Sequence, residues 1–576
     1  MRNNQQPFLA LFRQYQANVQ DQQLANRRET ILQVQKRLQE EGASPALYLE
    51  LHKVLRKEDF EAGIAALAEG CQRCPDEKLY RKLIFELEEA NRIDDALAAI
   101  ERARKLFPQS QFFDVAKALL LPAIYEKAED IPYYRERFTA GLKEVATGMR
   151  LETPEDRKSA LEALRRYIPF FLGYQGQNDR ELLEKYGRIV YRVMEANYLQ
   201  WIRRPTMPRV SAGERIRVGY LSRHFYLHST TKYFSGWLTR RNREEFEVFT
   251  FYNSRTSDAV TDEIRQASDH FVQIPEDFDK LCQEVLSSNL HILVYLDVRH
   301  SDIAAMAALR LAPVQCLAGG HPITWGAASI DYFLSNERME PENGQEHYSE
   351  RLIRLPGIGI YFPRPVIPRA ILDKKRADFG LAEDRTVYLC CQSLPKYLPQ
   401  HDDLFARIAK RLPAAQFIFL TWHEGLGEVF KARLARAFAA EGLKAPEHYV
   451  VRPGLDYHDY LNLLLVSDVF LDSLNWSGGL TALDAIAYGL PMVTLPGEYM
   501  RGRQSYGMLT QLGVTETIAR DKDQYVELAV ELGRDKQRRK TVSERMLAAH
   551  GQLFADMESV RGLEVFYRRV VSEWAG

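Results

Sequence analysis

The stretch VSDVFLDSLNWSGGLTALDAIAYGLPMVTLPGE, residues 466–498, decides the fold of this chain. Its pattern predicts a short apolar strand over 469–471, a loop of small residues, and a helix over about 480–488. Gly489 and Pro491 then end the helix, and a second strand is expected over 492–495. The stretch therefore predicts a β-α-β unit with two glycines where its helix begins.

Gly478 and Gly479 are the glycines at the start of this expected helix. Glycine lets the backbone approach a ligand closely, and the free N–H groups of a first helical turn attract anions. We therefore expect a diphosphate at this point, with the Thr481 hydroxyl beside it and the Asp484 carboxylate within reach of a sugar hydroxyl. The alternative is a tight turn that merely precedes a core helix.

Two series of short apolar segments, each followed by a helical pattern, extend this unit along the chain. The first series comprises residues 216–222, 246–252, 270–274, 291–297, 312–318 and 330–336. The second comprises residues 387–391, 417–422, 449–454, 469–471 and 492–495. Alternating strands and helices predict parallel sheets, so the expected fold class is α/β with two Rossmann-like lobes. The proline-rich segment 352–373 between the two series is interpreted as a crossover.

The residues before the first lobe have a helical pattern with a weak repeat. Segments 61–75 and 94–108 align with their closing prolines 33 residues apart, a spacing typical of tetratricopeptide hairpins. The alternative is an all-helical domain packed on the rest of the protein. The predicted organisation is an all-α, tetratricopeptide-like domain over 1–201, a linker over 202–214, an amino-terminal lobe over 215–370, and a carboxyl-terminal lobe with final helices over 371–576.

The composition excludes several classes of function. The chain has 576 residues, of which 46% are hydrophobic and 27% charged, and its net charge of −1 argues against nucleic acid as a partner. No apolar run suggests a membrane span or a secretory leader, so we expect a cytoplasmic protein. Cys71 and Cys74 form a CxxC without a second pair, which favours buried thiols over zinc. We find no DxD pair or clustered Asp and His ligands, and we expect neither a metal nor a cofactor.

Candidate site residues of the first lobe follow its strands, because ligands of such sheets bind at the carboxyl ends of the strands. His228 follows the first strand, where it can act as a base or orient a substrate hydroxyl. Gly320, His321 and Pro322 follow the fifth strand, and we expect their loop to line a sugar pocket. A conformational corner without a ligand is the alternative for this loop.

In the second lobe, Gln392, Ser393 and Lys396 follow the first strand and are expected to project into the cleft. A lysine at this point can neutralise the charge that develops on a phosphate leaving group, although a solvated surface lysine is the alternative. Tyr460 lies near the start of the helix before residue 469. Its ring can stack on a base, or it can simply pack the end of the helix.

Several segments together resemble the O-GlcNAc transferase and SPINDLY-like family, glycosyltransferase family 41. They are RVGYLSRHFYLHSTTKYF, HILVYLD, LAPVQCLAGGHPITWGAASIDYFLSNERMEPENGQEHYSERLIRLP and DVFLDSLNWSGGLTALDAIAYGLPMVTLPGEYMRGR. The resemblance covers about residues 216–567. It implies a GT-B fold and metal-independent, inverting transfer of a sugar from a UDP-sugar to an acceptor protein or peptide, with no cofactor.

The resemblance also implies roles for individual residues. His228 matches a histidine near the reacting hydroxyl, Lys396 the lysine that neutralises the diphosphate, and Tyr460 takes the place of a histidine that stacks on uracil. Thr481 matches the threonine at the helix start, and Asp484 matches the carboxylate near the ribose. The expected donor site is completed by Gln392, Ser393, Gly478, Gly479 and Leu480.

The chain departs from the family where animal members have Gly-His-Thr-Thr, because it has Gly-Gly-Leu-Thr over 478–481. Gly319 and Pro395 also replace bulkier residues near the sugar. The donor sugar, GlcNAc or a hexose, therefore stays open. The same loops are similar to those of bacterial adhesin N-glucosyltransferases, so transfer to asparagine is an alternative to serine or threonine. A catalytically silent helical-repeat adaptor is a third hypothesis, and a homo-oligomer is compatible with all three.

Overall fold

The computed structural model describes residues 26–575 apart from 212, 299–300 and 365–372. The chain divides into two compact units, Met1–Lys117 and Ala118–Gly576. The sequence before residue 26, residue 212 of the predicted linker and the predicted lobe boundary at 370–371 lie outside the described residues.

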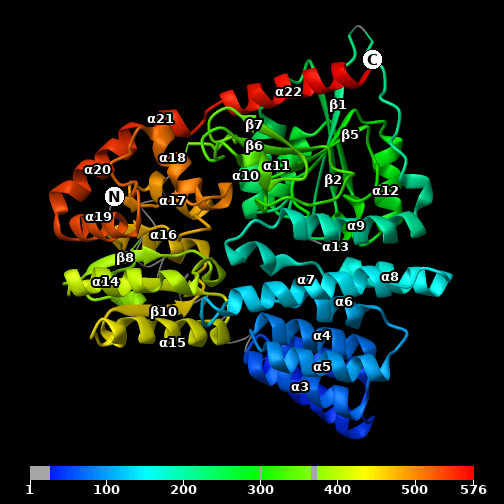
Figure 1. Cartoon of the computed structure of the whole chain (residues 1–576), viewed down its shortest axis with the longest axis horizontal. Helices are drawn as coiled ribbons and strands as arrows, with labels where there is room; N and C mark the ends of the chain where they lie inside the picture. Colours follow the sequence, from blue (N-terminus) through cyan, green and yellow to red (C-terminus); the bar gives the residue numbers. More distant parts are fainter. Residues whose placement is uncertain (1–25, 212, 299–300, 365–372, 576) are drawn as a thin grey trace. The chain divides into compact units, whose positions relative to one another are not determined.

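The first unit is all-α where it is described (Figure 1). Its helices include α2 (Pro45–Leu55), α3 (Phe60–Arg73), α4 (Glu77–Glu89) and α5 (Ile93–Leu106). The two segments that align in the sequence fall on α3 and α5, with α4 between them. Asp59 and Asp76 begin α3 and α4 by accepting hydrogen bonds from free N–H groups of the first turn. The helical character predicted for this region is confirmed.

The second unit begins with further helices that lead to the sheets. They are α7 (Asp130–Gly148), α8 (Pro154–Arg166), the 3-10 turn Phe170–Gln175 and α9 (Arg180–Asn197), while α6 (Phe112–Leu119) runs across the division between the units. A capping box begins α8, because the Thr153 hydroxyl accepts from the Asp156 N–H and the Asp156 carboxylate accepts from the Thr153 N–H. Helices α7 and α9 form the walls of a groove described below.

The first lobe is built on a seven-stranded parallel sheet of order β3-β2-β1-β4-β5-β6-β7. Its strands are β1 (Ile216–Ser222), β2 (Phe246–Tyr252), β3 (His270–Gln273), β4 (Ile292–Tyr295), β5 (Val314–Ala318), β6 (Tyr332–Asn336) and β7 (Arg351–Leu355). Its helices are α10 (Ser229–Thr239), α11 (Ala259–Ala267), α12 (Phe278–Ser287) and α13 (Ser301–Met306). The six predicted strands are confirmed. The start of segment 352–373 was wrongly assigned to a crossover, because Arg351–Leu355 pairs with β6 as an edge strand.

The second lobe has a five-stranded parallel sheet of order β10-β9-β8-β11-β12. Its strands are β8 (Thr386–Cys390), β9 (Ala415–Thr421), β10 (Tyr449–Pro453), β11 (Val469–Leu471) and β12 (Met492–Val493). Its helices are α14 (Asp403–Arg411), α15 (Glu424–Ala440), α16 (Tyr457–Val466), α17 (Leu480–Ala487), α18 (Gln504–Leu512), α19 (Lys522–Arg534), α20 (Lys536–Ala548) and α21 (His550–Leu553). Strand 469–471 and the helix from residue 480 form where the opening stretch predicts them.

The last helix, α22 (Glu558–Ala575), leaves the second lobe and packs on the first (Figure 1). The Tyr567 and Tyr220 hydroxyls lie 3.1 Å apart, so the helix contacts the central strand β1. The two Rossmann-like lobes, with the last helix crossing from the second lobe to the first, confirm the GT-B fold that the family resemblance implies. No helix within the described residues combines the length and the apolarity that crossing a bilayer requires.

Candidate active site

Asp472 organises the loop between β11 and α17. The carboxylate is buried at the end of β11, and it accepts hydrogen bonds from the Ser477 hydroxyl (2.6 Å), the Gly478 N–H (2.7 Å) and the Thr494 hydroxyl (2.7 Å). Burial raises the pKa of Asp472, and these hydrogen bonds oppose that rise. The loop therefore has a fixed shape in front of the helix.

Close neighbours leave no space for a side chain at either glycine of the loop. A Cβ at Gly478 would lie 2.9 Å from the Thr481 hydroxyl and 3.2 Å from the Gln392 side-chain nitrogen. A Cβ at Gly479 would collide with the Tyr233 hydroxyl of the first lobe. Neither glycine has a positive φ, so space rather than backbone conformation selects glycine here. The structure thus brings Gly478, Thr481 and Gln392 together, as the sequence predicts.

Lys396 lies opposite this loop, in the 3-10 turn that follows β8. Burial lowers the pKa of its ammonium group to about 8, although the nearby Asp472 carboxylate opposes the shift. Within the described part of the chain, no carboxylate lies within ion-pair distance of its Nζ. A desolvated cation without a partner attracts an anionic ligand strongly.

The neighbours of Lys396 on the same turn are also placed in the site. Gln392 is buried, and its carbonyl oxygen accepts from the Tyr397 hydroxyl (2.5 Å). Its side-chain nitrogen finds no acceptor among the described residues, so it can donate to a ligand. Ser393 is half-buried, and its backbone carbonyl accepts from the Lys396 N–H (2.9 Å), which fixes the turn.

The loop over 319–322 meets the glycine loop at the indole ring of Trp476. The His321 ring lies 4.9 Å from the Trp476 ring, and Lys396 Nζ lies 5.9 Å from the same ring. Tyr174, from the 3-10 turn before α9, stacks on Trp476 at 4.2 Å. Pro322 is buried, while Gly320 is exposed and has no space for a side chain against the Leu296 carbonyl. The predicted sugar-pocket loop and Lys396 are therefore brought to one place.

His228 caps the start of α10 in the first lobe. Its Nδ1 accepts a hydrogen bond from the Thr230 N–H (3.2 Å), and its ring stacks on the His224 ring at 3.8 Å. Burial lowers the pKa of His228, so the ring is neutral near pH 7. Because Nδ1 is an acceptor, the proton of the neutral ring lies on Nε2. This tautomer can donate a hydrogen bond through Nε2 but cannot accept a proton there.

Asp484 lies on α17 at the edge of a cleft of about 560 Å³ between the two lobes. Burial raises its pKa to about 6, and Lys232 of α10 opposes that rise. The Lys232 ammonium lies 4.1 Å above the ring of Tyr457, which is half exposed at the start of α16. The hydroxyl of Tyr460, one turn further along α16, is buried and has no hydrogen-bond partner among the described residues. Leu480, Thr481 and Asp484 are half-buried on α17, and Asp484 lines this cleft.

The structure shows one potential metal-binding group among the described residues, although the sequence analysis expected no clustered ligands. Ligand atoms of Asp456, His458 and Asp459 lie within 4.8 Å of one another at the start of α16. Asp459 already forms an ion pair with Lys374, and Asp456 accepts the Asp459 N–H (2.8 Å). We assign this group to capping of α16.

Four residues of the site were missed in the sequence. They are Tyr174, Tyr457, Asp472 and Trp476. Asp472 had a local signal, since a carboxylate that ends a strand before a glycine loop can hold that loop. Tyr174 had none, because its contact with Trp476 joins positions about 300 residues apart in the sequence.

Comparisons with known proteins agree with this geometry. The model of "Glycosyl transferase family 41" matches residues 196–362 and 365–557. A probable UDP-N-acetylglucosamine–peptide N-acetylglucosaminyltransferase SEC of Arabidopsis thaliana is 27% identical over 62% of this chain and 37% of its own length. The corresponding SPINDLY protein of Petunia hybrida is 25% identical over 61% of this chain and 38% of its own length. The chain thus spans less than two fifths of the length of these relatives.

A solved structure shares the fold of nearly the whole chain. It is a mutant of the O-GlcNAc transferase of Thermobaculum terrenum, with a TM-score of 0.67 and 24% identity over 95% of this chain and 98% of that one. The family model covers more than half of the sequence, including both lobes and the loops that carry the site. The chain therefore belongs to glycosyl transferase family 41.

Proposed function

We propose that this chain is a glycosyltransferase that moves a sugar from a UDP-sugar to a serine or threonine of an acceptor protein. One observation carries this proposal: the desolvated Lys396, which forms an ion pair with no described carboxylate, lies opposite the glycine-lined start of α17. Together they offer an ammonium group and free backbone N–H groups to one diphosphate. The printed names of the relatives, which describe transfer from UDP-N-acetylglucosamine to peptide, support the same class of reaction.

The remaining predicted residues fit the two ends of such a donor. The Asp484 carboxylate is available for a ribose hydroxyl, and the Tyr460 ring is proposed to stack on uracil, as the family resemblance implies. The Gln392 side-chain nitrogen is available for a phosphate or sugar oxygen. His321 and Trp476 would then border the sugar, since both lie on the Lys396 side of the glycine loop.

In the proposed reaction, the acceptor oxygen attacks the anomeric carbon from the face opposite the diphosphate. The bond from the anomeric carbon to the phosphate oxygen breaks, and its electron pair stays on the departing UDP. Lys396 stabilises this negative charge, so the protein itself supplies the charge compensation for an inverting, metal-independent transfer. The Nε2–H of His228 orients the acceptor oxygen, whose proton passes to solvent water as the new bond forms.

The proposal is tested by incubating the protein with UDP-GlcNAc or UDP-glucose and acceptor proteins, with and without EDTA. We expect UDP release and a sugar on serine or threonine, found by mass spectrometry, and the same rate when EDTA is present. Sugar found only on asparagine would support the N-linked alternative. If no UDP-sugar is transferred or hydrolysed, the result would support the adaptor hypothesis.

The six cysteines are free thiols, which is consistent with a proposed cytoplasmic location.

The affinity for UDP is expected to be highest between about pH 6 and pH 8. Lys396 must be protonated to attract the diphosphate, so affinity falls as the pH rises through the pKa of about 8. Asp484 must be ionised to accept from the ribose, so affinity also falls as the pH drops through its pKa of about 6. Calorimetric titration across this range checks both limbs. Lys396→Met should remove only the fall in affinity at alkaline pH, and Asp484→Asn should remove only the fall at acidic pH. A UDP affinity that does not change with pH in the unmodified protein would contradict both assignments.

A further inference from the structure

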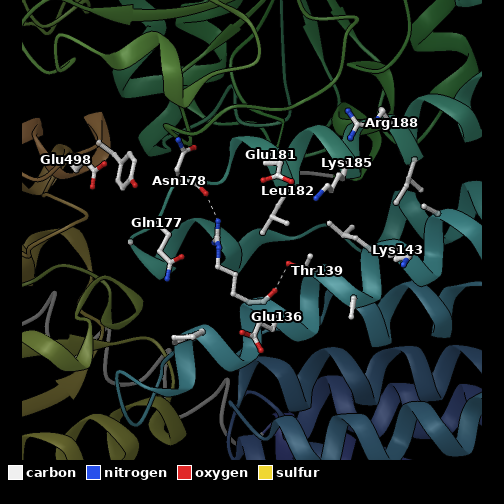
Figure 2. Close-up of a pocket in the computed structure, with 18 of the residues that line it drawn as sticks. Glu136, Thr139, Lys143, Gln177, Asn178, Glu181, Leu182, Lys185, Arg188 and Glu498 are labelled. Carbon is white, nitrogen blue, oxygen red and sulfur yellow. Dashed lines mark hydrogen bonds and ion pairs between the residues drawn. The ribbon is translucent and has the colours of Figure 1, made fainter.

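A long groove in the second unit lies outside the proposed donor site (Figure 2). Its walls are helices α7 and α9, one end is closed by Glu498 and Tyr499, and its volume is about 1280 Å³. The buried side chains Leu142, Leu182 and Ile189 form an apolar floor. A groove of this size exceeds the few hundred to about 1000 Å³ of a typical small-molecule site.

The groove ends beside the proposed donor site. Arg501 donates a hydrogen bond to the Gln177 carbonyl at this end (2.6 Å), and its guanidinium lies 4.5 Å from the Tyr499 ring. The same guanidinium lies 5.9 Å from the Trp476 ring, which lies 5.9 Å from Lys396 Nζ on another side. Because Arg501 and Trp476 are buried, they form the wall between this closed end of the groove and the position proposed for sugar transfer.

The groove has opposite charges at its two ends. Figure 2 shows Lys143, Lys185 and Arg188 gathered at the end away from Glu498. Lys185 forms an ion pair with Glu181 (2.6 Å), whereas Lys143 and Arg188 are exposed and, in the part of the chain that the structure describes, pair with no carboxylate. Glu498, at the other end, is exposed and likewise has no cationic partner among the described residues. Charge without an internal partner is available to a ligand of opposite charge.

The spacing and chemistry of the groove fit a peptide. Glu136 and Lys143 are separated by seven residues of α7, or about 10 Å, a distance that about three extended residues span. The Gln177 side-chain amide lies between the charged ends, and an amide can both donate to and accept from a peptide backbone. The neighbouring Asn178 amide donates to the Glu346 carbonyl and accepts from the Arg180 N–H. The apolar floor accommodates the side chains between the charges.

We propose that this groove binds an extended segment of the acceptor polypeptide, with an acidic side chain at Lys143 and Arg188 and a basic side chain near Glu498. The inference rests on the proposed function and deepens it, because it names the acceptor class. It also assigns part of acceptor selection to α7 and α9.

The test measures binding of short fluorescein-labelled peptides by anisotropy in the presence of UDP. Each peptide has a central serine or asparagine and one charged flank, made of either glutamates or lysines. In one set the charged flank precedes the central residue and in the other it follows, so that both directions of the peptide in the groove are tested. The full chain should bind one glutamate-flank peptide about five- to tenfold more tightly than its lysine-flank counterpart. The double variant Lys143→Glu/Arg188→Glu should invert this preference. Lys158→Glu, which changes an exposed lysine of α8 outside the groove, should preserve it.

Two outcomes would overturn the groove assignment: the same order of affinities in the wild type and the double variant, or no binding of any peptide. Hydrolysis and transfer of the UDP-sugar are measured on the same preparations, so that failure of the groove assignment can be told apart from failure of the proposed function. If the wild type turns over the donor but shows no preference for peptide charge, only the groove assignment is rejected. The absence of both hydrolysis and transfer would reject the proposed function instead.

Discussion

Replacing Lys396 with alanine is expected to slow sugar transfer about 100- to 1000-fold, the size of effect seen when one preorganised donor to developing negative charge is lost. Burial desolvates the ammonium group, as its lowered pKa shows. Without it, the departing diphosphate would be stabilised only by uncharged donors, namely the backbone N–H groups, the Thr481 hydroxyl and the Gln392 amide. Steady-state kinetics of UDP release, with each donor, measure the loss in kcat and in kcat/KM.

Stability separates this role from a structural one. Burial of the Lys396 charge already costs free energy, as its pKa of about 8 shows, and no described carboxylate would be left without an ion-pair partner. We therefore expect Lys396→Ala to unfold at or near the wild-type temperature. Lys431→Ala, which removes a surface lysine paired with Glu428 on α15, is the matched control and should keep full activity. Wild-type turnover in Lys396→Ala would refute the role assigned to this residue.

Gly479→Ala is expected to lower kcat/KM at least about tenfold and the free energy of unfolding by about 1–3 kcal/mol, as overpacked sites do. The added Cβ would collide with the Tyr233 hydroxyl and lie 2.9 Å from the Gln504 side-chain oxygen. Because Tyr233 belongs to the first lobe, the collision would push α10 away from the glycine loop. Kinetics and thermal unfolding measure the two effects.

A second substitution tests the steric cause. Tyr233→Phe removes the colliding oxygen and leaves the ring carbon 3.2 Å from the new Cβ, so the double variant should recover most of the lost stability and activity. Gly148→Ala, where a Cβ meets nothing within 4 Å, is the matched control and should behave as the wild type. Failure of Tyr233→Phe to improve Gly479→Ala would show that the glycine is needed for another reason.

The parts of the fold that depend on local patterns were predictable. Strand 469–471, the loop and α17 follow from an apolar run, a glycine pair and a Gly-Leu-Pro stop within one short segment. Strand β7 was missed because Arg351–Leu355 is short, carries two arginines and stands at the start of a proline-rich segment. Its identity as a strand comes from pairing with β6, which is a tertiary contact.

The same distinction applies to the candidate site. The rule that ligands bind at the carboxyl ends of parallel strands is sufficient to place Gln392, Ser393 and Lys396 in one loop. The contact of Tyr174 with Trp476 could not be predicted, since it joins a turn before the first lobe to a loop of the second. The groove between α7 and α9 also depends on how helices pack, and nothing in their separate sequences indicates it.

A crystal structure of the protein with UDP bound tests the placement of the donor most directly. We expect the diphosphate oxygens to accept hydrogen bonds from N–H groups at the start of α17 and from Lys396 Nζ, with the ribose at Asp484. A diphosphate located elsewhere, with Lys396 and α17 not engaged, would contradict this placement.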